Sequence, residues 1–152
     1  MSNDPIPLAE IQALAEFRYQ LRRFLRFSEV LVRDYGITAL QYQMMLQLKG
    51  FPDRQWANVG ELADRLQSHH HGVVSLVSRC EKLGLVERRT GRDDARNVEI
   101  HLTSKGDELV TRLARLHRDE LVARGDVFAV PTVADLRAGT IRRRSEGDGS
   151  RS

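Results

Sequence analysis

The sequence predicts a mainly α-helical protein with one small β-hairpin, an α+β fold. Two short segments, 59–66 and 69–83, have the apolar spacing of amphipathic helices and are separated only by a turn at Gln67 and Ser68. A hairpin rich in arginine follows over residues 85–102, and long helical segments flank this unit on both sides. Two helices joined this tightly and followed by a basic hairpin form a compact device for entering DNA grooves, the winged helix-turn-helix.

Composition limits the class of protein. The chain has 152 residues, 41% of them hydrophobic, which suffices for one packed domain or for two lobes that share a core. Its formal net charge of +3 permits nucleic-acid binding without requiring it, because the local placement of charge matters more than the total. The single cysteine excludes an intrachain disulfide, no apolar run reaches the ~20 residues of a membrane span, and residues 1–7 lack the features of a signal peptide. These observations predict a cytoplasmic protein with no membrane partner.

The first element is a long helix over residues 8–35. Its mostly apolar seam positions alternate in steps of three and four, which is the spacing that one helix offers to another. These positions are Leu14, Phe17, Leu21, Phe24, Ser28, Leu31 and Tyr35. A helix of this length extends roughly 40 Å, more than a small domain covers alone, so we expect a dimer core shared by two copies. Packing against its own chain is the alternative.

A second helix is predicted over residues 39–49. Gly36 ends the preceding helix, and Thr38 caps this one. We expect its buried face to contain Leu40, Met44, Met45 and Leu48. Trp56, beyond a turn at residues 50–53, is expected to anchor the base of the helix-turn-helix in the core.

The segment 69–83 is the expected recognition helix. Ser68 is placed to cap its start and Gly84 to end it. One stripe should be buried, formed by Val73, Leu76, Val77, Cys80 and Leu83.

The outward face of this helix carries the candidates for DNA recognition. Base-edge readers should lie near its N-terminal half, where we expect His70, His71 and Ser75. Ser68 and His69 could bind a phosphate together with the free backbone amides at the helix start. Two roles stay open for Arg79, which could bind a phosphate or tie the helix to its own domain.

The hairpin has the clearest β signal in its returning strand, where Val98, Ile100 and Leu102 alternate with polar residues and should form its buried face. We expect the outgoing strand at 85–89 and the tip at 90–95. The hairpin contains four arginines and four acidic residues, so its net charge is near zero. The prediction that it binds DNA therefore depends on geometry and not on charge.

Arginine at a projecting tip can reach phosphates or enter a narrow minor groove. The DNA-binding candidates here are Arg89, Arg92 and Arg96. Asp94, two residues before Arg96, could hold that guanidinium in place. A solvated hairpin with ordinary surface ion pairs is the alternative.

Another helix should begin at Thr103 or Ser104 and reach about Val122. Gly125 and Pro131 interrupt the chain beyond it, a short helix is expected over 132–141, and 142–152 is predicted to be a disordered tail. The expected domains are a helical dimerisation region, 8–35 with 104–141, and a DNA-binding domain, 36–103.

No cofactor, metal or catalytic arrangement is predicted. Adjacent helical residues diverge by about 100°, so the run from His69 to His71 cannot easily share one ion, although histidines that charge near neutrality could make DNA affinity depend on pH. Cys80 lies on the apolar stripe and is expected to be a buried, inert thiol, with redox sensing as the disfavoured alternative. The sequence contains no Gly-rich phosphate loop, no nucleophile elbow and no Cys/His zinc spacing, so an enzyme is not expected.

Three segments in this order and spacing resemble the MarR family, the multiple-antibiotic-resistance-type regulators of bacteria and archaea. The segments are Arg79 to Arg88 (RCEKLGLVER), Asp94 to Arg96 (DAR) and Leu102 to Gly106 (LTSKG). The resemblance covers roughly residues 10–122. It implies a homodimer built from the N- and C-terminal helices, a second motif helix in the major groove, and Arg96 in the minor groove. It also implies release from a palindromic operator by a small aromatic or phenolic anion bound between the lobes.

The sequence therefore predicts a homodimeric, sequence-specific transcriptional regulator in the cytoplasm of a bacterium or archaeon, associated with the nucleoid and acting as a repressor. Residues that could line a ligand pocket beside the first helix are Phe17, Arg18, Tyr19 and Arg22. The alternatives are a protein-interaction module that kept the winged fold without specific DNA binding, and a non-specific chromosome-coating protein.

Overall fold

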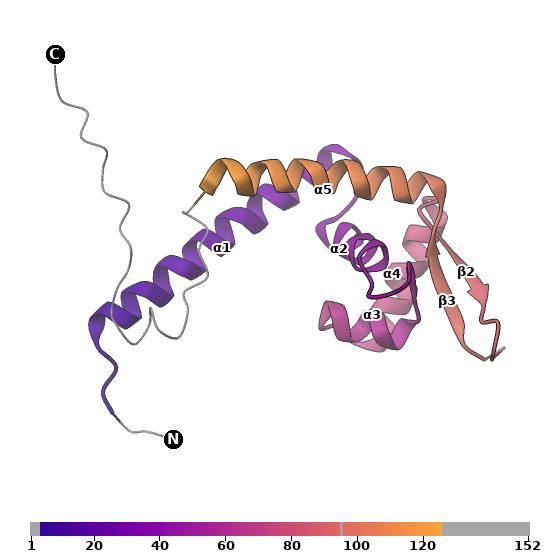
Figure 1. Cartoon of the computed structure of the whole chain (residues 1–152), viewed down its shortest axis with the longest axis horizontal. Helices are drawn as coiled ribbons and strands as arrows, with labels where there is room; N and C mark the ends of the chain where they lie inside the picture. The colour runs from indigo at the N-terminus through magenta and orange to yellow at the C-terminus, as the bar shows by residue number, and fades with distance from the viewer. Residues whose placement is uncertain (1–3, 95, 126–152) are drawn as a thin grey trace, which may run out of the picture. The chain divides into compact units, whose positions relative to one another are not determined.

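The computed structural model describes residues 4–94 and 96–125 (Figure 1). The chain divides into two compact units, residues 28–119 and residues 1–27 with 120–152. In order, the described elements are α1 (Leu8–Asp34), α2 (Ala39–Lys49), β1 (Trp56–Ala57), α3 (Val59–Leu66), α4 (His70–Lys82), β2 (Val86–Thr90), β3 (Val98–Leu102) and α5 (Ser104–Arg124). Helices with a small antiparallel sheet confirm the predicted fold class. The predicted helix at 132–141 and the tail at 142–152 lie outside the described residues.

Local chemistry sets the helix ends, as the sequence predicted for α1 and α2. Gly36, at φ +77°, donates its N–H to Arg33, and the next N–H returns to Val32, which closes α1 in a Schellman motif. Thr38 then caps α2 in a reciprocal capping box, in which the backbone N–H groups and side chains of Thr38 and Gln41 bond each other.

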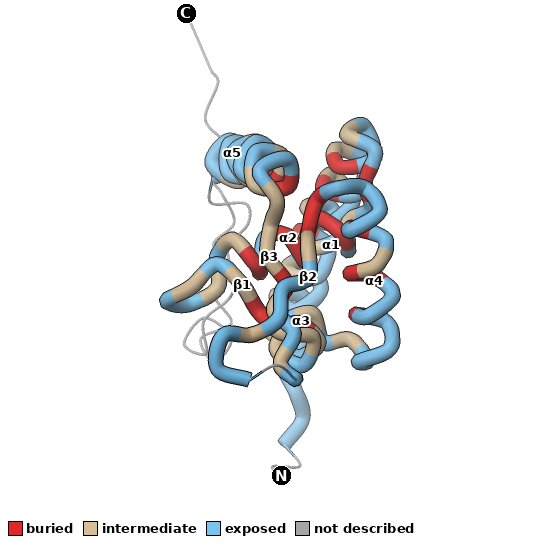
Figure 2. Tube along the Cα trace, turned by 90° about the vertical axis from the view of Figure 1, so that its right-hand side faces the viewer, coloured by how far each residue is buried: buried red, intermediate tan, exposed pale blue. Residues whose placement is uncertain are grey.

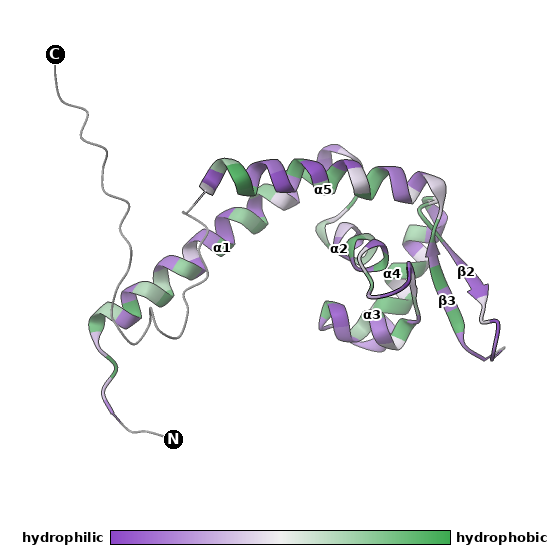
Figure 3. Ribbon diagram, in the orientation of Figure 1, coloured by the Kyte–Doolittle hydropathy of each residue, from purple (hydrophilic) through white to green (hydrophobic). Residues whose placement is uncertain are grey.

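The core of the 28–119 unit lies between α2, α3, α4 and the sheet. Figure 2 shows buried segments on α2, on α4 and along the strands. The fully buried large side chains are Val32, Met44, Met45, Leu48, Leu62, Val73, Val77, Leu85, Val86, Ile100, Val110 and Leu113. In Figure 3 hydrophobic and hydrophilic colours alternate along the helices, and the hydrophilic colour dominates at the tip of the hairpin.

The sheet has three strands in the order β1-β3-β2, one strand more than the sequence predicted. Strand β1 is only two residues long and pairs Trp56 with His101 and Ala57 with Ile100. Two residues are too few to show a period of two, so no sequence pattern could indicate this strand. Trp56, the expected core anchor, is only partly buried. Its neighbour Ala57 is the residue of β1 that is buried in the core.

The start of the recognition helix differs from the prediction. His69, and not Ser68, is the N-cap of α4. Gln67 adopts a left-handed conformation at φ +50°, which ends α3 and lets the Ser68 N–H bond to Ala63. The Ser68 hydroxyl then donates to Leu66 at 3.3 Å, so it serves the end of α3 and leaves the start of α4 uncapped.

Three residues expected to be buried are exposed instead. Leu40 is 41% exposed, Leu83 is 40% exposed and Val98 is 40% exposed. Each stands at an end of its element, where the neighbouring element no longer covers the apolar face. A periodic pattern cannot show where that cover ends.

Gly106 is the tightest packing point at the start of α5. A methyl group on it would overlap the carbonyl oxygen of Leu85 and approach Leu102 Cδ2 to 3.2 Å. Gly106→Ala should therefore lower the free energy of unfolding by about 1–3 kcal/mol, because backbone cannot move aside as a side chain can. Chemical denaturation followed by circular dichroism measures the change.

Gly72 in α4 is the matched control. A Cβ there would meet nothing within 4 Å. Gly72→Ala should raise helix stability by about 0.5–1 kcal/mol. Equal effects of the two substitutions would contradict the packing argument.

Candidate nucleic-acid interface

The recognition helix α4 presents one face that the core does not use. Val73, Val77 and Cys80 are 0% exposed and Leu76 is 5% exposed, which fixes the rotation of the helix. Four side chains in its N-terminal half are exposed, at His70, His71, Val74 and Ser75. The residues predicted to read bases therefore lie together on the solvent side of the helix.

The first turn of α4 has neither a side-chain cap nor an acidic residue. His69 caps it with backbone geometry only, and in the described residues no side chain bonds to its free amides. Its first turn contains no acidic residue, and the first helical hydrogen bond runs from the Val73 N–H to His69. Free amides and the positive end of the helix dipole make such a turn suitable for a phosphate oxygen.

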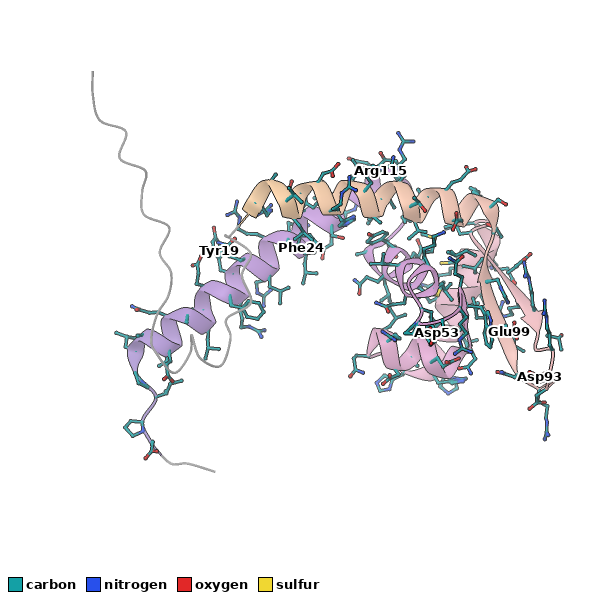
Figure 4. The ribbon with its side chains drawn as sticks, viewed as in Figure 1. Tyr19, Phe24, Asp53, Asp93, Glu99 and Arg115 are labelled. Atoms are coloured by element: carbon teal, nitrogen blue, oxygen red, sulfur yellow. The ribbon has the colours of Figure 1, made fainter. Side chains whose placement is uncertain are left out.

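The wing leaves the side chain of Arg96 almost fully exposed to solvent. Its side chain is 94% exposed, and its backbone N–H donates to Asp94 Oδ1 at 2.9 Å. The same carboxylate oxygen lies 3.5 Å from Arg96 Nε, so Asp94 orients the residue through both backbone and side chain, as predicted. Figure 4 labels Asp93 at the tip of the hairpin and Glu99 farther along β3.

The other wing arginines have different surroundings. Arg89 is ion-paired with Glu87 on the same strand, and Arg92 is exposed at the tip. Arg88 is bound to Glu81 and Ser78 of α4. On α4 itself, Arg79 is exposed and has no ion pair among the described residues.

A stack of planar groups beside α3 was not predicted from the sequence. The Arg54 guanidinium lies 4.5 Å from the centre of the Phe51 ring and 3.9 Å from that of Trp56. Trp56 stacks on His101, whose Nε2 is 2.9 Å from Glu99 Oε1. The position of Arg54 between Phe51 and Trp56 in the sequence was the available signal, and cation–π contacts explain it.

Arg65 of α3 also contacts this stack. Its guanidinium lies 5.2 Å from the centre of the Phe51 ring, and the residue is exposed at the end of α3. The stack fixes the loop between α2 and β1 against the helix that precedes the recognition helix.

A buried polar cluster joins the first and last helices of the 28–119 unit. His117 is 6% exposed, its Nδ1 lies 2.7 Å from the Leu113 carbonyl, and its Nε2 lies 2.8 Å from Ser28 Oγ. Because a carbonyl oxygen can only accept, Nδ1 carries a proton. The His117 ring stacks on Tyr42 at 4.4 Å, and burial raises the pKa of the Tyr42 hydroxyl.

The predicted ligand-lining residues all lie on α1 in the other unit. Phe17 is partly buried, and Arg18, Tyr19 and Arg22 are exposed. The Arg23 guanidinium lies 5.7 Å from the centre of the Tyr19 ring. Two hollows in the 28–119 unit are lined by other residues: one of about 470 Å³ near Lys49 and His101, and one of about 310 Å³ near Arg33 and Ile37.

Residues 4–94 and 96–125 form neither a metal-ligand cluster nor a membrane-spanning helix. No group of three or more His, Cys, Asp or Glu side chains within that part could hold a metal ion. Over the same residues, no helix is long and apolar enough to cross a bilayer. The rings of His70 and His71 meet edge to face with their centres 6.3 Å apart.

This arrangement defines a winged helix-turn-helix protein, and comparisons with known proteins agree. The MarR family model matches residues 35–97. The chain is 27% identical, over 82% of its length, to a Thauera aromatica protein whose name assigns it to transcriptional regulation of the hcr operon, and the match covers 70% of that protein.

Solved structures share the fold. AbsC, a MarR family transcriptional regulator from Streptomyces coelicolor, matches with a TM-score of 0.71 and 19% identity over 90% of each chain. The F27L mutant of S. aureus MepR, solved with a bound oligodeoxyribonucleotide, matches with a TM-score of 0.61 and 19% identity over 80% of this chain and 88% of that one. Residues 35–97 thus match the MarR family model, the matched relative is named as a transcriptional regulatory protein, and the predicted resemblance to the MarR family is confirmed.

Cys80 is predicted to be unreactive in the folded protein. It is 0% exposed, and burial raises the pKa of its thiol to about 11, so roughly one thiol in a thousand is ionised at pH 8. A thiol-specific chromogenic reagent at pH 8 should react at least about 100-fold more slowly with the native chain than with the chain in guanidinium.

The same shift fixes the sign of the pH dependence of stability. The stabilisation from the neutral thiol is present below the reference pKa of 9.0 and is lost as the pH rises toward 11. Equal labelling rates with and without denaturant would show that the thiol is accessible and would reopen the redox alternative.

Proposed function

We propose that the protein is a homodimeric repressor that binds a palindromic operator and releases it when a small aromatic or phenolic anion binds. The observation that carries the DNA-binding part is the outward face of α4, held by a buried stripe and starting in an uncapped, acid-free turn. His70, His71 and Ser75 on this face read base edges in the major groove, while Ser68, His69, Arg79, Arg89 and Arg92 contact phosphates. Arg96 enters the minor groove.

Exposed apolar residues of the other unit support dimerisation. In the described part of that unit, Leu8 is 68% exposed, Ile11 45%, Leu14 41% and Val122 73%. These residues come from α1 and from the end of α5, the two segments that the sequence assigns to a dimer core. A second copy of the chain would cover them and would hold two recognition helices on half-sites about 10 base pairs apart.

The ligand part of the proposal depends on the family resemblance and on residue chemistry. Phe17 and Tyr19 offer aromatic surface, and Arg18 and Arg22 offer guanidinium groups, which together suit an aromatic anion. A panel of small aromatic carboxylates and phenols, added to the protein–DNA complex, should contain compounds that dissociate it. If none does so at millimolar concentration, the ligand part of the proposal is wrong.

A gel-shift assay with the DNA upstream of the protein's own gene tests the operator proposal, followed by a footprint on genomic DNA. We expect a preferred, two-fold symmetric site bound far more tightly than random sequence. Fusion of that site to a reporter promoter tests repression. Binding without any sequence preference would favour a non-specific chromosome-coating protein, and no binding at all would favour a protein-interaction module.

Arg96→Ala should weaken operator binding by about 1–3 kcal/mol if the guanidinium makes a direct groove contact. Fluorescence anisotropy at matched salt concentrations measures the loss. The control is Arg115→Ala, which removes an exposed arginine from α5, away from the wing. An affinity unchanged by Arg96→Ala, or equally reduced by both variants, would refute the groove contact.

Leu14→Glu should shift the protein from dimer toward monomer, because it places a charge at a seam position that is 41% exposed in the single chain. Sedimentation equilibrium measures the association constant. Gln12→Glu, on another face of the same helix, is the control with the same added charge. A wild-type protein that sediments as a monomer at micromolar concentration would overturn the dimer itself.

A further inference from the structure

Glu81 of α4 holds two separate groups of Arg88 on β2. Arg88 Nη1 donates to Glu81 Oε1 at 2.8 Å, and the Arg88 backbone N–H donates to Glu81 Oε2 at 3.3 Å. One carboxylate therefore binds both the side chain and the backbone of the same residue. This contact joins the recognition helix to the wing.

Ser78 provides a second side-chain contact between Arg88 and α4. Arg88 Nη2 donates to Ser78 Oγ at 3.0 Å, and Ser78 in turn donates to the Val74 carbonyl at 3.1 Å. Ser78 and Glu81 are three residues apart, so they stand on one side of α4, one turn from each other. The forked guanidinium spans them as a compact lysine ammonium could not.

We infer that Glu81, acting through Arg88, is a positioning residue that sets the angle of the wing against the recognition helix; this inference rests on the proposed DNA-binding function. Strand β2 is an edge strand whose other side pairs only with β3. The Arg88 N–H points away from β3 toward α4, so Glu81 closes the open edge that would otherwise leave the wing free to twist. Arg96, at the far end of the hairpin, then reaches the minor groove in a fixed relation to α4.

The same geometry separates Arg88 from the wing arginines proposed to contact DNA. Its side chain is 32% exposed, against 94% for Arg96, and both terminal nitrogens of its guanidinium already donate to α4. Glu81, 42% exposed, is a negative charge on the recognition helix. An acid there repels DNA phosphates, whereas its bonds to Arg88 give it a positioning role that can benefit binding.

A pure charge effect and a positioning role predict changes in DNA affinity of opposite sign when Glu81 is neutralised, and this difference provides the test. The probe is a duplex selected from a random-sequence pool by the wild-type protein, and affinities are measured at several salt concentrations. Glu81→Gln removes a negative charge and should raise affinity if charge alone mattered. The positioning role predicts the opposite, a loss of about 3- to 10-fold, with the salt slope unchanged because no phosphate contact is removed.

Glu87→Gln is the matched control, with the same change of charge on the same hairpin. Glu87 binds Arg89 and has no bond to α4 among the described residues, so its removal should leave affinity equal or higher. Arg88→Lys keeps the positive charge and loses the fork. It should bind as weakly as Glu81→Gln, whereas a simple phosphate contact would survive that substitution.

Coupling to Arg96 separates positioning from general loss of stability. In a double-mutant cycle, Arg96→Ala should cost less in the Glu81→Gln background than in the wild type, although these two side chains do not touch. Amide exchange of Arg88 in the free protein gives a readout without DNA and should be faster in Glu81→Ala. Additive losses, tighter binding by Glu81→Gln, or unchanged exchange would overturn the inference while wild-type binding persists. A wild-type protein that selects no duplex would overturn both this inference and the proposed function.

Discussion

Burial of one stripe of α4 fixes which of its side chains can meet DNA. Val73, Leu76, Val77 and Cys80 are buried members of the hydrophobic core. Rotating the helix by one residue, about 100°, would expose apolar side chains worth roughly 1.5–3 kcal/mol each and would bury polar ones such as His71. The core thus selects the outward face of α4, which is the proposed reading face, and the outward residues are free to vary in chemistry without loss of the fold.

The wing depends on that same helix. Strand β2 has β3 as its hydrogen-bonded neighbour on one side and a carboxylate from α4 on the other. The arginines of the hairpin consequently differ in what they bind: Arg88 is engaged with α4, Arg89 with its own strand, and Arg96 is held by Asp94 yet almost fully exposed. A hairpin that is near neutral overall can still present a strong local positive charge, because its acids neutralise selected arginines and leave others open to solvent.

A buried polar cluster connects the segments that enter and leave the DNA-binding lobe. Ser28 on α1, Tyr42 on α2 and His117 on α5 meet inside the 28–119 unit, and within the described residues no fully buried side-chain polar atom lacks a hydrogen-bond partner. Satisfied buried networks favour one arrangement over others, since any shift leaves a polar group without a partner. The cluster therefore fixes the parts of α1 and α5 that belong to this unit.

The sequence by itself determined the helices within the described residues, the hairpin and the resemblance to the MarR family, because apolar periodicity, Gly36 and Thr38 act within a few residues of where they stand. It also placed His70, His71 and Ser75 on the outward face of α4, since the buried stripe is periodic. Tertiary structure alone decided the rest: a two-residue β1, the uncapped start of α4, the exposure of Leu40, and the partner of Arg88. Each of these depends on which distant group comes within hydrogen-bond or packing range, and such long-range neighbours leave no period in the chain.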